Sequence, residues 1–260
     1  MARDFTLIRY RELLTAFLNA GYAIEPVEDL HRDVRGRRRL LLRHDVDDLP
    51  VQSLKKAHIE KELGIRSTYY FRIVEESNHP VAIRAIANLG HEIGYHYEDL
   101  SLANGDFKKA RLYFEKNLEY FRNYYPVRTI CMHGSPTSIW DNRMIWRELR
   151  YQDYGIITEP YFDIDFSKTL YLTDTGRRWD GNRVSVRDKV RDSFQNKFHY
   201  RHTGDIISAV TAGLLPDEVM ITTHPQRWLD EFWPWTKEYI LQNMKNSIKK
   251  YFYVQHPLTD

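Results

Sequence analysis

Pairs of acidic residues and single histidines follow several apolar segments of this sequence, and these residue types can hold a divalent cation and move protons. The first group comes directly after the apolar run Leu40–Leu42, where one valine separates Asp45 from Asp47. In an extended strand, residues two apart point to the same face, so we expect the two carboxylates to stand side by side. Neighbouring carboxylates repel each other unless a cation joins them. The pair therefore favours a metal site, with helix capping as the alternative, a role that suits Asp48 better.

The segment His91–His96 supplies a candidate imidazole ligand. Its two histidines are five residues apart, so on a helix the second ring would be rotated by about 140° from the first. In a strand, His91 lies at the entrance and His96 at the exit, which favours His96 as the ligand and a structural role for His91. Glu98 shares the face of His96 if the chain stays extended, and a solvated loop carboxylate is the alternative.

Two further histidines stand where strands are expected to end. His133 is followed by Gly-Ser-Pro and His224 by Pro225, and such residues hold the chain in a defined turn. A lone histidine is usually an ordinary hydrogen-bonded side chain, but two more at strand ends are expected to line a pocket. In a glycine-containing loop, Asp174 suits the orientation of a histidine and Trp179 suits stacking on a sugar, with loop capping and burial as the alternatives.

Alternating strand and helix patterns supply the scaffold for these residues. An amphipathic helix is expected within Thr6–Tyr22, before the first strand. The first expected strand starts with the apolar run at 40–42 and ends in the acidic segment 44–48, and the others lie around residues 67–71, 91–96, 127–132, 155–158, 170–173 and 219–223. Strands that alternate with helices predict a parallel α/β sheet, closed or nearly closed into a barrel whose strand ends share one rim. We find no linker or repeat, so we expect a single domain over residues 1–260.

Composition excludes several classes of protein. With 42% hydrophobic and 28% charged residues, the chain is typical of a globular protein, and a net charge of +2 does not favour a nucleic-acid partner. The single cysteine, Cys131, excludes an internal disulfide and a cysteine-rich metal site. No apolar run reaches the roughly 20 residues of a membrane span, and the N-terminal apolar run is too short for a signal peptide. We therefore expect a cytoplasmic protein without a transmembrane segment.

The order of these motifs resembles that of the NodB-type polysaccharide deacetylases, carbohydrate esterase family 4, and in particular of intracellular relatives encoded with surface-polysaccharide synthesis. Asp45-Val46-Asp47 is similar to the first motif in its Asp-x-Asp form. The segment 90–96 closely resembles the second motif, Gly-His-Glu-Ile-Gly-x-His, and it alone is specific by itself. Segments 133–136, 174–179 and 221–224 occupy the places of the remaining motifs. The resemblance spans roughly residues 40 to 228.

This resemblance implies a distorted (β/α)7 barrel with an added N-terminal helix. It also implies a metal-dependent hydrolase that cuts a linear amide C–N bond, removing an acetyl or formyl group from an acetamido sugar. The sugar would be nucleotide-linked, lipid-linked or part of a polymer, and the setting would be the synthesis of a cell-surface polysaccharide, O-antigen or capsule, including lipopolysaccharide biosynthesis. Asp45 would match the catalytic base, Asp47 and His96 the metal ligands, and His224 the catalytic acid. Mixed oxygen and nitrogen ligands favour zinc among divalent metals.

Two positions depart from the family pattern. The second motif usually supplies another histidine where this chain has Leu100, so we expect Glu98 as the third metal ligand, with His133 as the second choice. The third motif lacks its usual arginine. Either His133 positions Asp45 in its place, or the substrate and chemistry differ.

The remaining site residues have supporting roles. His133, Ser135 and Trp179 are expected to contact the substrate, and Asp174 is expected to hold the ring of His224. Because of Leu100, a carbohydrate-binding relative with altered catalysis is the main alternative function. A metal-dependent Asp-x-Asp glycosyltransferase is less favoured, since it needs no histidines at three later strand ends.

Overall fold

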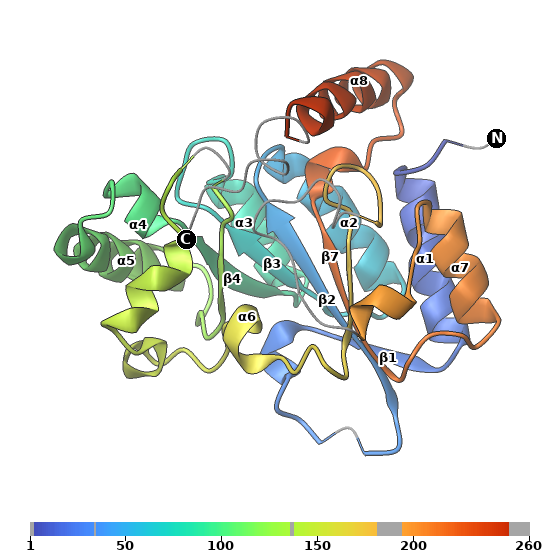
Figure 1. The fold of residues 1–260 in the computed structure, drawn as a ribbon, viewed down its shortest axis with the longest axis horizontal. Helices are drawn as coiled ribbons and strands as arrows, with labels where there is room; N and C mark the ends of the chain where they lie inside the picture. The colour runs from blue at the N-terminus through green and yellow to red at the C-terminus, as the bar shows by residue number, and fades with distance from the viewer. Residues whose placement is uncertain (1–2, 34, 136–137, 181–193, 250–260) are drawn as a thin grey trace.

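The described strands form one parallel sheet around a central strand, β2 (Arg38–Val46), in the computed structural model (Figure 1). The structure describes residues 3–33, 35–135, 138–180 and 194–249. The strand order is β5 (Ile130–Met132), β4 (Glu92–Tyr97), β3 (Thr68–Phe71), β2, β7 (Glu218–Thr223) and β6 (Leu170–Thr173). A seventh strand, β1 (Tyr22–Glu25), pairs with the first half of β2. Every pairing is parallel, so the carboxyl ends of the strands meet at one rim.

The expected α/β fold, a distorted seven-stranded parallel barrel, is confirmed. Its distortion lies between β5 and β6, which end the strand order and do not pair with each other among the described residues. An isolated bridge between Thr129 and Thr158 extends the β5 edge. The strand expected at residues 155–158 is reduced to this bridge, because Gly155 closes one helical turn with φ +72° and Pro160 begins the next helix. The seventh strand is instead β1, which sequence analysis did not predict.

Helices cover the sheet from several sides. They are α1 (Leu7–Asn19), α2 (Pro50–Glu62), α3 (Pro80–Asn88), α4 (Asp99–Leu102), α5 (Phe107–Arg122), α6 (Pro160–Asp163), α7 (Thr203–Thr211) and α8 (Phe232–Lys249), with 3-10 turns η1 (Val27–Asp29), η2 (Asn142–Arg147), η3 (Tyr151–Tyr154), η5 (Gln195–Lys197) and η6 (Pro225–Arg227). Figure 1 shows α1 beside α7 at one end of the sheet and α4 beside α5 at the other. The N-terminal helix α1 begins where Thr6 Oγ1 accepts a hydrogen bond from Arg9 N. Among the described helices, we find none with the length and hydropathy needed to span a bilayer.

Side chains of β2 alternate between two environments. Leu40 and Leu42 pack in the apolar cluster that includes α1, whereas Leu41 packs with Ile164 and Met220 in a separate cluster. Because side chains alternate along a strand, Arg43 and Asp45 follow Leu41 onto its face, and His44 follows Leu42. The strand thereby carries a charged pair into the protein interior at its carboxyl end.

A glycine makes room for an aromatic ring beside the site. A Cβ atom added at Gly94 would collide with the ring of Tyr70, so a larger residue does not fit at this position of β4. The Tyr70 ring in turn lies 6.3 Å, centroid to centroid, from the imidazole of His96. The glycine of the second motif therefore has a packing role in placing His96.

Candidate metal and catalytic site

The two aspartates at the carboxyl end of β2, Asp45 within the strand and Asp47 just after it, approach the same imidazole, as their spacing predicts. His96 Nε2 lies 3.8 Å from Asp45 Oδ2 and 3.6 Å from Asp47 Oδ1. The N-cap residue of α2 is Leu49, which adopts a left-handed conformation, and no side chain caps the helix by a hydrogen bond. Asp45, Asp47 and Asp48 therefore do not cap α2. The capping role expected for Asp48 is therefore wrong.

Hydrogen bonds to the far side of each ring fix the orientation of two imidazoles. His96 Nδ1 lies 2.9 Å from the carbonyl oxygen of Cys131, and His133 Nδ1 lies 2.9 Å from Glu98 Oε2. Both partners are acceptors, so each ring carries its proton on Nδ1 and has a lone pair on Nε2. Both Nε2 atoms lie 3.6 Å from Asp47 Oδ1. Burial lowers the pKa of His96 to about 4, which keeps this ring neutral near pH 7.

One carboxylate oxygen of Asp47, Oδ1, lies near both the His96 ring and the His133 ring. Asp47 Oδ1 is buried without a hydrogen-bond partner among the described residues. Burial raises the pKa of Asp47, whereas the protonated forms of His133, His224 and His96 and the charge of Arg72 lower it, and the net direction is downward. An ionised oxygen that faces two nitrogen lone pairs is unfavourable unless a cation lies among them. Asp47, His96 and His133 thus offer one oxygen and two nitrogen ligands of the kind that zinc prefers.

Glu98 occupies a different place from the one expected of a third ligand. Arg72 donates to both carboxylate oxygens of Glu98, at 2.7 and 2.9 Å, and Oε2 also meets His133 Nδ1 and the Ser135 hydroxyl. Both oxygens are therefore engaged by hydrogen bonds. The geometry places Glu98 behind His133, where it orients the ring, and favours His133 over Glu98 as the third ligand.

Arg43 is a site residue that sequence analysis missed. Its guanidinium is fully buried and donates to Asp45 Oδ2 at 2.9 Å and to Cys131 Sγ at 2.8 Å. Arg43 therefore holds Asp45 in position, a role that the sequence suggested for His133. The spacing of Arg43 and Asp45, two apart in one strand, is the signal that would have revealed it.

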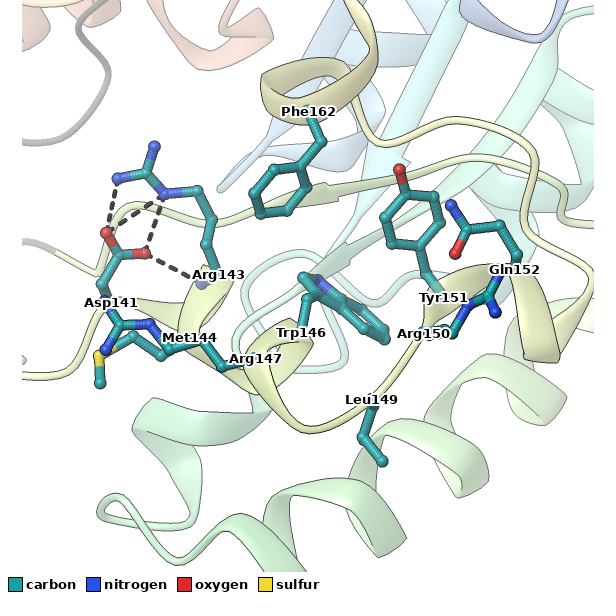
Figure 2. A pocket seen from close by; sticks show the side chains of 10 residues that line it. All are labelled: Asp141, Arg143, Met144, Trp146, Arg147, Leu149, Arg150, Tyr151, Gln152 and Phe162. Carbon is teal, nitrogen blue, oxygen red and sulfur yellow. Dashed lines mark hydrogen bonds and ion pairs between the residues drawn. The ribbon is translucent and has the colours of Figure 1, made fainter.

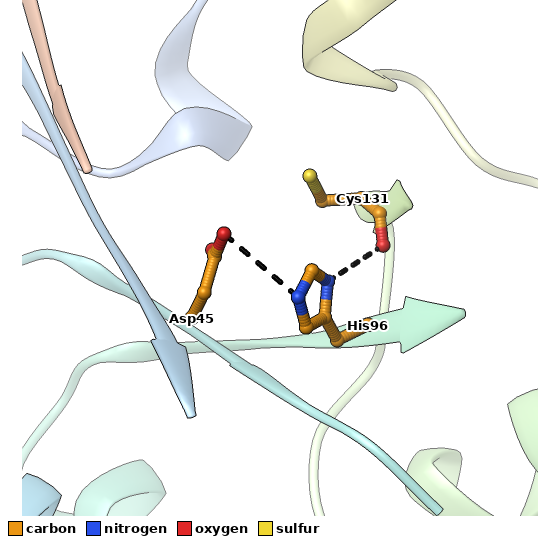
Figure 3. A group of neighbouring side chains, drawn as sticks. All are labelled: Asp45, His96 and Cys131. Atoms are coloured by element: carbon orange, nitrogen blue, oxygen red, sulfur yellow. Dashed lines mark hydrogen bonds and ion pairs between the residues drawn. The ribbon is translucent and has the colours of Figure 1, made fainter. Parts of the chain in front are cut away.

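A second group of potential ligand atoms is formed by Asp45, His96 and Cys131, all buried (Figure 3). Arg43 contacts two of these three side chains, and an arginine stays charged at any physiological pH. A cation bound there would be repelled by this guanidinium. The set of Asp47, His96 and His133 is therefore the better candidate, although both sets share His96.

On the opposite side of Asp47, a buried network holds the ring of His224. Its Nδ1 lies 2.6 Å from Asp174 Oδ1, and its Nε2 lies 3.8 Å from Asp47 Oδ2. Asp174 also accepts from Arg227 at 2.8 Å and from the indole of Trp228 at 2.7 Å. Asp174 thus contacts the ring of His224 directly, and its orienting role stays a prediction.

Charges within this network favour a protonated His224. Burial opposes ionisation of Asp174, but Arg227 and His224 outweigh it and lower the pKa of Asp174 well below its usual range. For His224, burial and Arg227 lower the pKa, whereas Asp174 and Asp47 raise it, and the net direction is upward. His224 is thus suited to donate a proton, while His96 is suited to bind a cation.

Other expected site residues lie elsewhere or behind the cluster. Trp179 is 5% exposed, stacks on Phe5 at 6.1 Å and donates its indole N–H to Thr203, so it is not placed to stack on a sugar. Trp179 is buried because it packs among apolar side chains, including those of Phe5 and Trp228. Ser135, two residues after His133, adopts φ +36°, and its hydroxyl contacts Glu98. Pro136 of the third motif lies outside the described residues.

Comparisons with known proteins find similarity only among solved structures. No family model and no curated protein matches the chain. A carbohydrate esterase family 4 pseudoenzyme from Bacillus anthracis is 13% identical, with a TM-score of 0.42 over 82% of this chain and 62% of that one. A peptidoglycan N-acetylglucosamine deacetylase is 15% identical, with a TM-score of 0.43 over 91% and 90%. The family 4 domain of a xylanase from the hindgut metagenome of Trinervitermes trinervoides is 16% identical, with a TM-score of 0.40 over 81% and 84%.

These structural neighbours are family 4 carbohydrate esterases at low identity, and they include a pseudoenzyme as well as a deacetylase. The chain spans less than two thirds of the pseudoenzyme's length. With TM-scores below 0.5, such likenesses do not decide what this chain does.

Proposed function

We propose that this protein is a metal-dependent hydrolase that removes an acetyl or formyl group from the nitrogen of an acetamido sugar. One observation carries the proposal: the buried Asp47 Oδ1 lacks a hydrogen-bond partner among the described residues and faces the Nε2 atoms of His96 and His133. A cation satisfies all three atoms at once. When bound, a divalent cation, with zinc favoured, supplies Lewis acidity that polarises an amide carbonyl and acidifies an attacking water.

Asp45 has the geometry of a general base in this reaction. Arg43 holds its Oδ2, whereas its Oδ1 is buried and has no hydrogen-bond partner among the described residues. That oxygen is therefore available to accept the proton of a water that attacks the amide carbon. The guanidinium keeps the carboxylate in one orientation, so the accepting oxygen points to a defined place.

His224 has the geometry of the general acid. Asp174 holds Nδ1, and the proton on Nε2 faces the cluster from the side of Asp47. When the C–N bond breaks, this proton goes to the departing sugar nitrogen, which leaves as a free amine, and the acyl group leaves as a carboxylate. The base and the acid thus approach Asp47 from separate strands, β2 and the end of β7.

The alternative of a binding protein without catalysis rested on Leu100 in place of a histidine. Leu100 is fully buried in the apolar cluster of β4 and α5, so this position does not reach a metal site here. His133 offers an imidazole instead, which supports the hydrolase. A role in surface-polysaccharide synthesis and a cytoplasmic location stay predictions from the sequence.

Metal analysis joined to an acetate-release screen tests the proposal. We expect purified protein to retain about one divalent ion and to release acetate or formate from at least one acylated amino sugar among nucleotide-linked, lipid-linked and polymeric substrates. Asp45→Asn should lose the release but keep the metal, and His224→Ala should do the same. Undiminished release by Asp45→Asn, or wild-type protein that binds no divalent ion, would overturn the proposal.

A further inference from the structure

The C-terminal helix α8 exposes more large apolar side chains than any other described helix. Trp233 is 76% exposed, the highest value among the large apolar residues that the structure describes. The full set on this helix is Phe232, Trp233, Tyr239, Ile240, Leu241 and Met244. A group of exposed apolar side chains on one element is typical of a surface that binds a partner.

Three of these side chains form a stripe that points away from the body of the protein. At about 100° per residue, Trp233, Ile240 and Met244 lie within about 40° of one another around the helix axis. The opposite direction is that of Gln242, which is 6% exposed and marks the side that contacts the body. Figure 1 shows α8 on the outside of the molecule. We call Trp233, Ile240 and Met244 the outer stripe.

Polar contacts hold the inner side of α8 against the turn that follows β6. Asn246 donates its side-chain N–H to the backbone oxygen of Gly176 at 2.8 Å. Arg177 donates to the backbone oxygen of Trp235 at 3.0 Å, and its guanidinium lies 4.4 Å from the centroid of that indole. The turn begins at Asp174, whose backbone oxygen accepts from Arg177 N at 2.8 Å. α8 is therefore fixed to the rim of the sheet that carries the catalytic cluster.

Positive charges flank the outer stripe. α8 contains three lysines and one glutamate, which gives the helix a net charge of +2. Lys237 and Lys245 are exposed, whereas Glu238 is half-buried on the inner side. Arg3, also exposed, lies 5.8 Å from the ring centroid of Phe232 at the start of the helix. The apolar stripe is thus accompanied by cations on the side that faces solvent.

Outside α8, one described aromatic side chain is similarly exposed, and its setting is different. Phe162 is 50% exposed and lines a concave pocket of about 480 Å³ with residues of η2 and η3 (Figure 2). It stacks on Tyr151 with ring centroids 6.2 Å apart. A concave pocket suits a small molecule. The outer stripe runs along a single convex helix, which suits a broad surface.

We propose that the outer stripe of α8 binds the surface of a bilayer that contains anionic phospholipids. A helix with an apolar stripe and flanking lysines lies in the plane of the interface, with its apolar side chains among the acyl chains and its lysines near the phosphate groups. Tryptophan is favoured at this depth, since its ring is apolar and its N–H is polar. A second copy of the chain suits the stripe less well, because it would bring the same lysines together. This inference goes beyond the proposed function and does not depend on it.

Co-sedimentation with vesicles tests this surface without substrate or metal. The vesicles contain phosphatidylglycerol and phosphatidylcholine in equal parts, or phosphatidylcholine alone. We expect the wild type to bind the anionic vesicles at least about tenfold more tightly than the neutral ones, and more weakly as salt is added. Trp233→Ser/Ile240→Ser should bind the anionic vesicles more than about tenfold more weakly than the wild type. The proposal fails if the wild type does not bind anionic vesicles, or if this double variant binds them equally well.

A matched control removes two exposed apolar side chains from other helices. Val81 on α3 and Leu112 on α5 are 73% and 64% exposed, comparable with Trp233 and Ile240 at 76% and 53%. We expect Val81→Ser/Leu112→Ser to bind anionic vesicles as the wild type does. Both double variants should unfold at the wild-type temperature, since each altered side chain is exposed. Equal weakening of vesicle binding in the two variants would refute a specific role of α8.

Analytical ultracentrifugation without lipid distinguishes a bilayer from a second copy of the chain. We expect the wild type and Trp233→Ser/Ile240→Ser to have the same sedimentation coefficient. A wild-type dimer that this double variant dissociates would assign the stripe to a subunit contact and refute the proposal. Vesicle binding requires neither metal nor substrate, so its failure would leave the proposed hydrolase untouched.

Discussion

The Nε2 atom of His133 lies 3.6 Å from Oδ1 of Asp47. This contact joins the end of β5 to the end of β2, which are separated in the sheet by β3 and β4. It is wider than a hydrogen bond and compatible with two ligands that share one ion. His133 therefore supplies an imidazole to this cluster. Leu100, which stands where the second motif usually has a histidine, is buried in the core and supplies none.

Metal retention should depend on His133 far more than on Glu98. His133→Ala removes a ligand nitrogen, so we expect the protein to lose most of its bound metal. Glu98→Gln leaves the three ligand side chains in place but weakens the hydrogen bond that orients His133 and removes the ion pair with Arg72, so affinity should fall by about tenfold. Zinc titration with a competing chelator measures both. A variant Glu98→Gln that loses metal as completely as His133→Ala would show that Glu98 is a ligand itself.

Arg43 should affect turnover more than substrate affinity. In Arg43→Lys the positive charge stays, but the paired contacts to Asp45 and Cys131 are lost. Because misplacement of a base slows catalysis, we expect kcat to fall by about 10- to 100-fold with KM little changed. Cys131→Ala keeps the contact between Arg43 and Asp45 and serves as the milder control. Equal losses in the two variants would contradict the assignment.

Asp174→Asn should impair the proposed acid while the metal is retained. The carboxylate holds Nδ1 of His224 at 2.6 Å, and an amide in its place allows the ring to turn or to change its tautomer. We expect kcat to fall by roughly 10²- to 10⁴-fold, measured by acyl release at saturating substrate. Metal content should match the wild type. A loss of metal equal to that of His133→Ala would instead make Asp174 part of the metal site.

Stability should fall as the pH rises through neutrality, in part because of Glu92. Burial, with the nearby charge of Glu28, raises the pKa of Glu92 from 4.5 to about 7. The folded state therefore holds this proton more tightly than the unfolded chain. Its contribution is complete below about pH 4.5 and is lost as the pH rises through about 7, by up to roughly 3 kcal/mol.

The substitution Glu92→Gln tests this pH dependence. The amide has no proton to lose, so the free energy of unfolding should vary less between pH 5 and pH 8 than in the wild type. Urea denaturation at several pH values measures it, and Glu119→Gln, at an exposed position of α5, is the control. The same pH slope in Glu92→Gln and wild-type protein would disprove the contribution of Glu92.

Local patterns were enough to predict most of the scaffold. The parallel α/β fold follows from apolar segments that alternate with amphipathic ones, and six of the seven expected strands are present. The four residues of β1 escaped prediction because a short edge strand has too few positions to show a pattern. The strand expected at residues 155–158 does not form because Gly155 ends one helical turn and Pro160 begins the next.

The sequence by itself determined which residue types stand at the strand ends, because periodicity and turn residues act over a few neighbours. It therefore indicated Asp45, Asp47 and His96 together. Only the tertiary structure decided that Glu98 pairs with Arg72, that Arg43 holds Asp45, and that Trp179 is buried away from the site. Those outcomes depend on which strands become neighbours in the sheet and on which buried charges need a partner of opposite charge. Neither can be predicted from the pattern of a few neighbouring residues.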